Sequence, residues 1–152
     1  MKLAEALADR SDCQKKIEKL KERLVSCARV QEGEKPVEDP NALLAELRAA
    51  HLTLADLATR VNRTNAMTAF EPGVTLSDAL AQRDHFMALR ASLARVVEAA
   101  SIRADRMTRS EVKYVSTIAV RELQAEVDSL AQAHRKLDSR IQEFNWATEL
   151  LS

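Results

Sequence analysis

The chain has 152 residues, the usual size of one domain, so a single helical domain spanning residues 1–152 with a core of its own is expected. Apolar residues make up 46% of the sequence but aromatic residues only 3%, a balance that favours close contact between helices over a wide globular core. Lysine plus arginine and aspartate plus glutamate both number 23, so the chain lacks the net positive charge that non-specific binding to nucleic acids needs. No nucleic-acid partner is expected.

The sequence contains no pattern typical of a membrane-spanning or secretory segment. No apolar run approaches the roughly 20 residues that span a bilayer. Charged residues interrupt the first ten positions, where a signal peptide needs an apolar stretch. These observations predict a cytoplasmic protein.

Glycines and prolines divide the chain into long helices. The only glycines are Gly33 and Gly73, and the only prolines are Pro36, Pro40 and Pro72, so all strong helix breakers lie in two short windows. The last segment is too long for one ordinary helix and needs a turn near its middle. The predicted helices cover about 1–31, 41–65, 76–106 and 119–150.

Each predicted helix repeats apolar residues at steps of three and four, the a/d pattern of a coiled coil. In the third helix the apolar residues occupy more than one face, so this helix is expected to contact two neighbours or a partner chain. The fourth helix is the most regular. Its seam positions are Val120, Leu123, Val127, Leu130, His134, Leu137, Ile141, Phe144, Thr148 and Leu151. The fold class predicted is mainly all-α, with four long helices as antiparallel coiled-coil hairpins or a bundle.

A short β element is also predicted. Between residues 108 and 118, β-branched and aromatic side chains replace the alanines and leucines, which favours an extended chain over a helix. We therefore predict a strand near 110–118. A lone strand needs a partner, and the best local candidate is 67–70, although pairing across subunits is equally allowed.

The sequence lacks the patterns that bind nucleotides or metals. Two isolated glycines cannot form a phosphate-binding loop, and none of the three histidines follows a glutamate by three residues, as a di-iron bundle needs. A single seam histidine such as His134 more often forms core hydrogen bonds or sets register than binds a metal. Cys13 and Cys27 are interpreted as small buried hydrophobic residues, too far apart on one helix for a disulfide. We therefore predict no enzyme, no catalytic residue, no cofactor and no metal site.

Two sets of polar residues at the helix ends are the candidate binding sites. If the helices alternate in direction, the ends of the second and fourth meet at one pole and form a polar pocket with one aromatic wall. The other pole would gather a mixed-charge set, suited to pairing between subunits or to an anionic ligand. Helix capping and loop anchoring are the alternative explanation for both sets. The first set is Asn62, Arg63, Thr64, Asn65, Asn145 and Trp146, and the second is Arg29, Gln31, Glu32, Arg109, Glu111, Lys113 and Tyr114.

Several segments resemble a family of small bacterial helical proteins, some of which carry the label septicolysin. The segments are Met1–Leu7, 28–40 (ARVQEGEKPVEDP), 62–65 (NRTN), 75–84 (TLSDALAQRD), 109–118 (RSEVKYVSTI) and 137–150 (LDSRIQEFNWATEL). The similarity covers nearly the whole chain. It implies a cytoplasmic bacterial protein and supplies no catalytic residue, while the label suggests a secreted, membrane-damaging toxin.

The leading hypothesis is a non-enzymatic helical protein that self-associates and serves as a structural or interaction module, because one short chain carries four seams. The expected assembly is a closed homo-oligomer, most often a dimer, and a further protein partner is unidentified. Two alternatives remain open. One is a membrane-active, septicolysin-like protein, which the basic first helix would permit. The other is a small-ligand binder that uses the polar poles.

Overall fold

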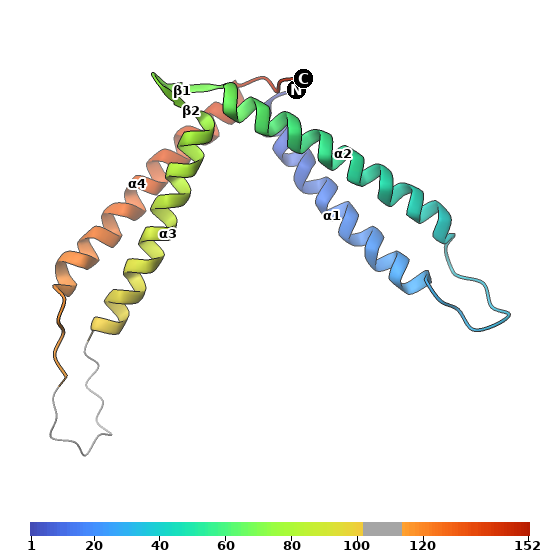
Figure 1. Ribbon diagram of the computed structural model, residues 1–152, viewed down its shortest axis with the longest axis horizontal. Coiled ribbons are helices and arrows are strands. Elements are labelled where there is room, and N and C mark those ends of the chain that lie inside the picture. Colours follow the sequence, from blue (N-terminus) through green and yellow to red (C-terminus); the bar gives the residue numbers. More distant parts are fainter. Residues whose placement is uncertain (102–113) are drawn as a thin grey trace, which may run out of the picture. The chain divides into compact units, whose positions relative to one another are not determined.

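The computed structural model describes residues 1–101 and 114–152, and most of them are helical. The helices are α1 (Leu3–Cys27), α2 (Pro40–Met67), α3 (Leu76–Ala100) and α4 (Val120–Ala147), and the strands β1 (Ala69–Glu71) and β2 (Val74–Thr75) lie between α2 and α3 (Figure 1). The mainly all-α prediction is confirmed. Each helix begins within two residues of its predicted start, because the helix breakers and capping residues mark these positions in the sequence.

Local hydrogen bonds explain two of these helix starts. At α2, the Asp39 side chain accepts a hydrogen bond from the Asn41 amide at 2.9 Å, and Pro40 occupies the first helical position, where its missing N–H has no cost. At α1, the Lys2 amide donates to the Glu5 carboxylate at 2.6 Å. Both contacts satisfy backbone groups that a helix end leaves without partners.

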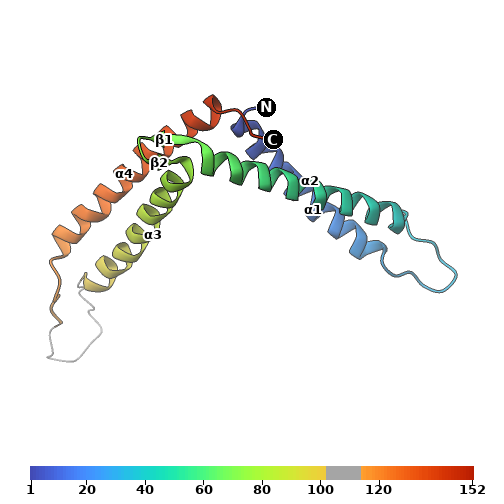
Figure 2. The ribbon, with the colours of Figure 1, turned by 45° about the horizontal axis from the view of Figure 1, so that its top comes forward.

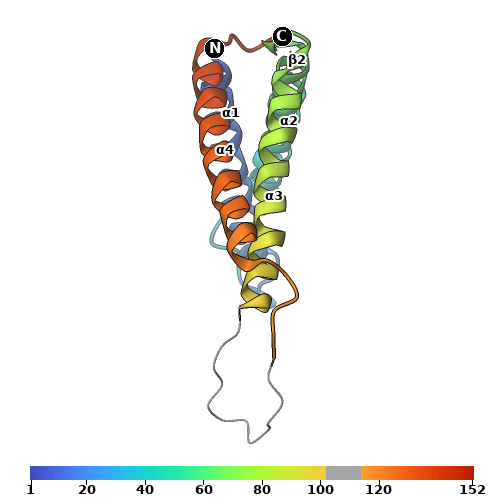
Figure 3. The same cartoon turned by 90° about the vertical axis from the view of Figure 1, so that its left-hand side faces the viewer.

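Contacts between residues divide the chain into two compact units. Unit 1 comprises Met1–Ser77 and Gln142–Ser152, and unit 2 comprises Asp78–Ile141. Unit 1 contains the hairpin of α1 and α2, and unit 2 contains most of the hairpin of α3 and α4, whose helices lie side by side in all three views (Figure 1, Figure 2, Figure 3). The predicted helical hairpins are therefore present, and their coiled-coil geometry stays a prediction. The expectation of a single domain stays a prediction.

The α1–α2 hairpin encloses a continuous apolar seam. Its buried members and the half-buried residues packed against them are Ile17, Leu20, Cys27, Leu43, Ala50, Cys13, Leu24, Leu47 and Leu54. Three of these nine are alanine or cysteine, whose small side chains allow two helices to approach closely. Both cysteines carry free thiols, and the Cys13 thiol donates to the Ala50 carbonyl oxygen at 3.2 Å.

The α3–α4 hairpin is less completely buried. On α4, every position of the predicted seam is buried or half-buried except Leu151, which lies beyond the helix and is 36% exposed. The seam prediction for this helix is therefore confirmed. Among the described residues of unit 2, however, only Ala79, Val127 and Ile141 are buried.

A two-residue turn gives β1 its partner. β1 pairs antiparallel with β2, and Ala69 lies opposite Thr75. Pro72 and Gly73 connect the strands, and Gly73 has a φ of 79°, a conformation that glycine adopts without steric cost. The short strand predicted at 67–70 is therefore present, shifted by about two residues, but its partner lies next to it in sequence.

The prediction of a strand near 110–118 is wrong for the residues that the structure describes. Residues 114–118 form no strand, and residues 110–113 lie outside the described residues. The physical reason is that β-branched side chains favour a strand only where a neighbouring strand offers hydrogen bonds. The edge at 67–70 pairs with β2, which it reaches through a short turn at a lower loop-closure cost than a distant segment.

Candidate functional site

The end of α2 is tied to the residues that follow α4 by hydrogen bonds within unit 1. Thr64 is fully buried, and its hydroxyl accepts from the Leu151 amide at 3.0 Å while donating to the Arg60 carbonyl at 2.8 Å. The Arg60 side chain donates to the Leu151 carbonyl at 3.1 Å, and Arg63 donates to the Ser152 carbonyl. Residues 148–152, which we call the C-terminal tail, therefore lie on the last turns of α2.

The same tail pairs with the beginning of the chain. The Leu3 amide donates to the Thr148 carbonyl and the Leu150 amide donates to the Met1 carbonyl, both at 2.9 Å. The Lys2 ammonium lies 2.7 Å from a Glu149 carboxylate oxygen, and it also donates to the backbone carbonyl that ends α4. These contacts form an antiparallel bridge between residues 2 and 149.

The electrostatics of this bridge favour the ionised form of Glu149. Its pKa is lowered, mainly by hydrogen bonds from Lys2 and from the amino terminus and further by their positive charges, while desolvation acts in the opposite direction. The Glu149 side chain is 64% exposed, so water screens these attractions. The bridge therefore orients the tail more than it stabilises the fold.

Apolar packing accompanies the tail contacts. Leu3, Val61 and Leu76 are almost completely buried, and the rings of Phe70 and Phe144 lie 4.6 Å apart between centroids with their planes tilted by 46°. An offset, tilted pair of this kind is favourable for aromatic rings. The end of α2, the β1–β2 pair and the end of α4 thus share one core in unit 1.

The first set of predicted site residues lies around this core. Asn62 and Arg63 are exposed, Asn65 is half-buried and Asn145 is buried. Trp146, expected as the aromatic wall of a pocket, is 63% exposed. The C-terminal tail occupies the C-terminal end of α2, so the described contacts there are those of chain anchoring, and ligand binding by this set stays a prediction.

The structure describes only part of the second set of predicted residues, and the described members belong to two different units. Arg109, Glu111 and Lys113 lie outside the described residues. Tyr114 is described, lies in unit 2 and is 83% exposed. The residues expected beside it, Arg29, Gln31 and Glu32, are exposed and belong to unit 1. Their assembly into one site therefore stays a prediction.

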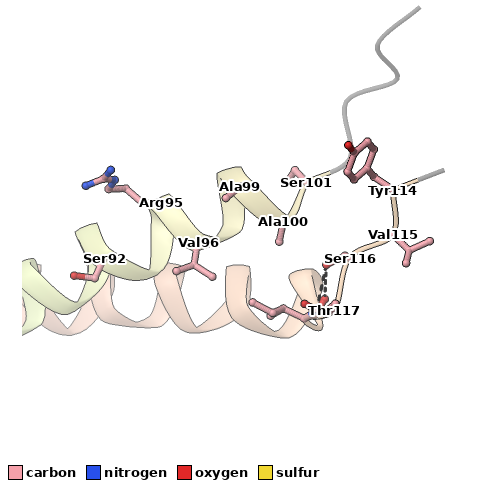
Figure 4. Close-up of a pocket in the computed structure, with 11 residues that line it drawn as sticks. Ser92, Arg95, Val96, Ala99, Ala100, Ser101, Tyr114, Val115, Ser116 and Thr117 are labelled. Carbon is pink, nitrogen blue, oxygen red and sulfur yellow. Dashed lines mark hydrogen bonds between the residues drawn. The ribbon is translucent and has the colours of Figure 1, made fainter. Parts of the chain in front are cut away.

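Tyr114 borders a hollow at the far end of the α3–α4 hairpin. The hollow measures about 840 Å³, is open to solvent and lies between the last turns of α3 and the segment 114–118 (Figure 4). Its other walls are formed mainly by alanine, valine and residues with hydroxyl groups. Figure 4 shows Val96 and Ala100 on the side of α3 that faces the start of α4, whereas Arg95 points away. Arg95, the only charged side chain among the described lining residues, is therefore not directed into the hollow.

An arginine joins the two helices of unit 2. Arg83 on α3 contacts Asp84 at 2.8 Å and Asp138 on α4 at 3.4 Å. The pKa of Arg83 is raised, mainly by its hydrogen bond to Asp84. Desolvation, the second-largest effect, opposes the increase, and the hydrogen bond to Asp138 contributes less. The arginine therefore remains charged and links α3 to α4.

Comparisons with known proteins place the chain in a family. The model of a family of unknown function, DUF6847, matches residues 10–150. The chain belongs to this family. The structure is similar to the crystal structure of a functionally unknown conserved protein from Corynebacterium diphtheriae, with a TM-score of 0.94, 42% sequence identity and coverage of 99% of both chains. No curated protein matches the chain.

Two classes of site can be assessed in this DUF6847 chain. Across residues 1–101 and 114–152, no group of three or more histidine, cysteine, aspartate or glutamate side chains is placed to hold a metal ion. Within the same ranges, no helix combines the length and apolar character needed to cross a membrane. The resemblance to proteins labelled septicolysin stays a prediction.

The anchoring residues of the DUF6847 chain were only partly accessible to sequence reasoning. Thr64 and Arg63 belong to a predicted polar set, but Arg60 and Leu151 do not. Arg60 follows Thr53 by seven residues on a helix that contains further arginines. Nothing in this pattern indicates that the Arg60 side chain bonds to a backbone carbonyl. The pairing of polar side chains with the tail backbone depends on the fold, which brings together residues 87 and 91 positions apart.

Proposed function

We propose that this DUF6847 protein is a non-enzymatic helical module that self-associates into a closed homo-oligomer. The observation that carries the proposal is an exposed apolar side chain on α3. Met87 is 53% exposed. Val96 is nine residues further on and lies on the side of α3 that faces the start of α4 (Figure 4). At about 100° per residue, Met87 lies on the opposite side of the helix from Val96, where α4 does not cover it.

The incomplete burial of the α3–α4 seam supports the same proposal. Its large side chains are half-buried, although they occupy the positions that would form a core. They are Phe86, Leu89, Leu93, Leu123, Leu130 and Leu137. Each further 100 Å² of apolar surface removed from water contributes about 2.5 kcal/mol. Additional helices packed on this hairpin would therefore gain substantial stabilisation.

A second copy of the chain is the simplest source of those helices. Small units with few buried residues commonly depend on oligomerisation for stability, and soluble homo-oligomers usually close through twofold symmetry. A twofold contact joins the same surface of both copies. The half-buried seam together with the exposed Met87 offers such a surface, present once in every copy.

The mass in solution tests this function. We expect light scattering coupled to size exclusion to give a multimer at micromolar concentration, with dissociation on dilution over a hundredfold range. The variant Met87→Lys places a charge on the apolar flank and is expected to raise the dissociation constant about tenfold or more, because buried unpaired charges strongly weaken interfaces.

Ala88→Lys is the matched control for this experiment. Ala88 is exposed and lies next to Met87 on the side of α3 that is turned away from the seam. A lysine at this position therefore introduces the same charge outside the proposed surface. A compact monomer for the wild-type chain at all concentrations would disprove the proposed function. Equal effects of the two variants would show that the α3 flank is not the contact surface.

The small-ligand alternative is favoured by one observation, the hollow of about 840 Å³ beside Tyr114. Its volume lies within the roughly 300–1,000 Å³ of ligand pockets, but it is open to solvent. A bound ligand would raise the melting temperature of the wild-type chain. Ala100→Trp, which fills the hollow, would remove that increase, whereas a panel of metabolites without any thermal shift would count against this alternative.

A further inference from the structure

The outer face of α2 carries an exposed leucine. Leu52 is 73% exposed, whereas Leu43 and Val61, which belong to the buried side of the same helix, are 4% and 1% exposed. Leu52 is nine residues from each of them, and at about 100° per residue this spacing places it on the opposite side of α2. The packing of α2 within unit 1 therefore leaves Leu52 uncovered.

Two charged residues flank this leucine on the same face. Arg48 precedes Leu52 by four residues and Asp56 follows it by four, so the three side chains form one ridge along the helix surface. Arg48 and Asp56 are separated by about 80° around the helix axis, and both are exposed. The exposed residues beside this ridge are small, and they are Ala45, Ala49, Ala55 and Thr59. Such neighbours allow a second helix to approach the ridge closely.

The chain itself uses these two charges little. Among the described residues, Arg48 has no ion-pair partner. Asp56 pairs with Arg60 at 3.5 Å, and its side chain is 65% exposed, so this pair contributes little to stability. The other acidic residue of α2, Glu46, pairs with Lys16 of α1 at 2.9 Å and so belongs to the hairpin. Arg48 and Asp56 are therefore available to a partner.

The ridge is complementary to its own reverse. An antiparallel copy of α2 centred on Leu52 places each residue beside the one that is equally far from Leu52 in the other direction. Arg48 of each copy then lies beside Asp56 of the other. Packed helix axes are about 8–10 Å apart, a gap that an arginine side chain can span. An interface between identical surfaces requires this symmetry, whereas a contact with a different protein does not.

We propose that two copies of the chain pack along the outer faces of α2, with these helices antiparallel about a twofold axis at Leu52 and with Arg48 of each copy paired with Asp56 of the other. This inference rests on the proposed self-association and adds a contact in unit 1 to the one on α3. The contact removes both copies of Leu52 from water, and the ion pairs beside them fix the direction and register of the helices.

Charge reversal tests the ion pairs. Arg48→Glu places a carboxylate beside Asp56 of the other copy, and Asp56→Arg places a second cation beside Arg48. Each variant is expected to dissociate at about tenfold higher concentration than the wild-type chain in light scattering coupled to size exclusion. An equimolar mixture of the two variants should regain wild-type association, because both cross-axis contacts again join opposite charges. Lys19→Glu makes the same charge change at an exposed position of α1 and should leave association unchanged.

A matched pair of variants tests the apolar centre of the contact. Leu52→Gln removes the leucine from the twofold axis and is expected to weaken association several-fold, because the glutamine amide would be desolvated there. Val25→Gln is the control, since Val25 is 78% exposed on α1 and lies outside the proposed contact. Equal effects of the two variants would contradict a specific role of Leu52.

Disulfide cross-linking tests the direction and register. In Leu52→Cys the two new thiols meet at the axis, where a disulfide between copies can form under mild oxidation. In Thr59→Cys, seven residues further along α2, the thiols of an antiparallel pair would be about 21 Å apart and should not cross-link. A parallel pair of helices would cross-link both variants. The wild-type chain controls for the native thiols of Cys13 and Cys27.

The outcomes distinguish the two proposals. Charge variants that keep the wild-type mass at every concentration, a mixture that stays as dissociated as its components, or cross-linking of Thr59→Cys as fast as that of Leu52→Cys would each overturn the α2 contact. If the wild-type chain is multimeric and responds only to Met87→Lys, the α2 contact fails while the proposed function stands. A wild-type chain that is monomeric at every concentration overturns both.

Discussion

The two hairpins of this protein have similar lengths and similar heptad patterns, but they bury their seams to different extents. The α1–α2 seam alternates leucines with alanine and cysteine, and residues such as Leu20 are almost completely buried. The α3–α4 seam consists mainly of larger side chains, and most of them remain half-buried. Small residues let helices approach until few gaps remain, whereas large residues on both helices keep the axes apart. The heptad pattern predicts pairing, but residue size decides how complete the pairing is.

The largest expected effect compares one leucine from each hairpin. Leu20→Ala removes a side chain that is 1% exposed and is expected to lower the free energy of unfolding by about 3 kcal/mol. Leu130→Ala, at a half-buried seam position of α4, should cost about 1 kcal/mol in the dissociated chain. Urea denaturation followed by circular dichroism measures both. Equal losses would contradict the difference in burial.

A smaller effect is expected at the base of the α1–α2 hairpin. Thr64→Val keeps the shape of a fully buried residue but removes the hydroxyl that accepts a hydrogen bond from the Leu151 amide. We expect this change to lower the free energy of unfolding by about 1–3 kcal/mol. Hydrogen exchange at Leu151 should become faster. Thr59→Val is the control, because the exposed Thr59 hydroxyl bonds only to the Ala55 carbonyl within α2. Unchanged exchange at Leu151 in Thr64→Val would show that the tail is held by other contacts.

The smallest effect concerns pH. Four carboxyl groups of unit 1 have a lowered pKa, and they are Asp12, Glu38, Glu46 and Glu149. A carboxyl with a lowered pKa in the folded state contributes stability above its unfolded pKa, which is about 4.3 for glutamate. This contribution is lost as the pH falls through the lowered folded pKa.

Hydrogen exchange resolved by hairpin, followed from pH 6 down to pH 3 and corrected for the intrinsic exchange rate, measures this loss. We expect α1 and α2 to lose protection as the pH falls through this range. Glu38→Gln should make the α1–α2 response weaker, because it removes one of the titrating groups. An unchanged α1–α2 response in the variant would contradict a contribution from Glu38.

Several elements of the fold could be predicted because their signals are local. Asp39 and Pro40 mark the start of α2 by capping chemistry, and the eight seam positions that lie in α4 follow from spacing alone. The strand near 110–118 was predicted from β propensity, which is a weaker guide because a strand also needs an available edge. Pro72 and Gly73 form the turn that brings β2 to the edge of β1, so β1 pairs with a strand that is closer in sequence than 110–118.

The candidate site could be predicted less well than the fold. Thr64 and Asn145 were selected as polar residues at helix ends, but a pattern of polar residues does not distinguish an open pocket from groups that the chain itself satisfies. The decisive contacts are backbone carbonyls and amides of the tail, which every residue possesses and which therefore leave no trace in the sequence. The ion pair between Lys16 and Glu46 was also missed, since ion pairs between helices depend on which residues face each other.

The antiparallel bridge between residues 2 and 149 has a practical consequence. Because the Met1 and Leu150 backbones are joined by a hydrogen bond, a linker of a few residues would connect the two ends without disturbing either. New ends could then be opened in the exposed loop between α1 and α2, near Gly33, where no side chain is buried. The protein is thus suited to circular permutation, and a permuted chain would carry its tags at the outer end of the α1–α2 hairpin.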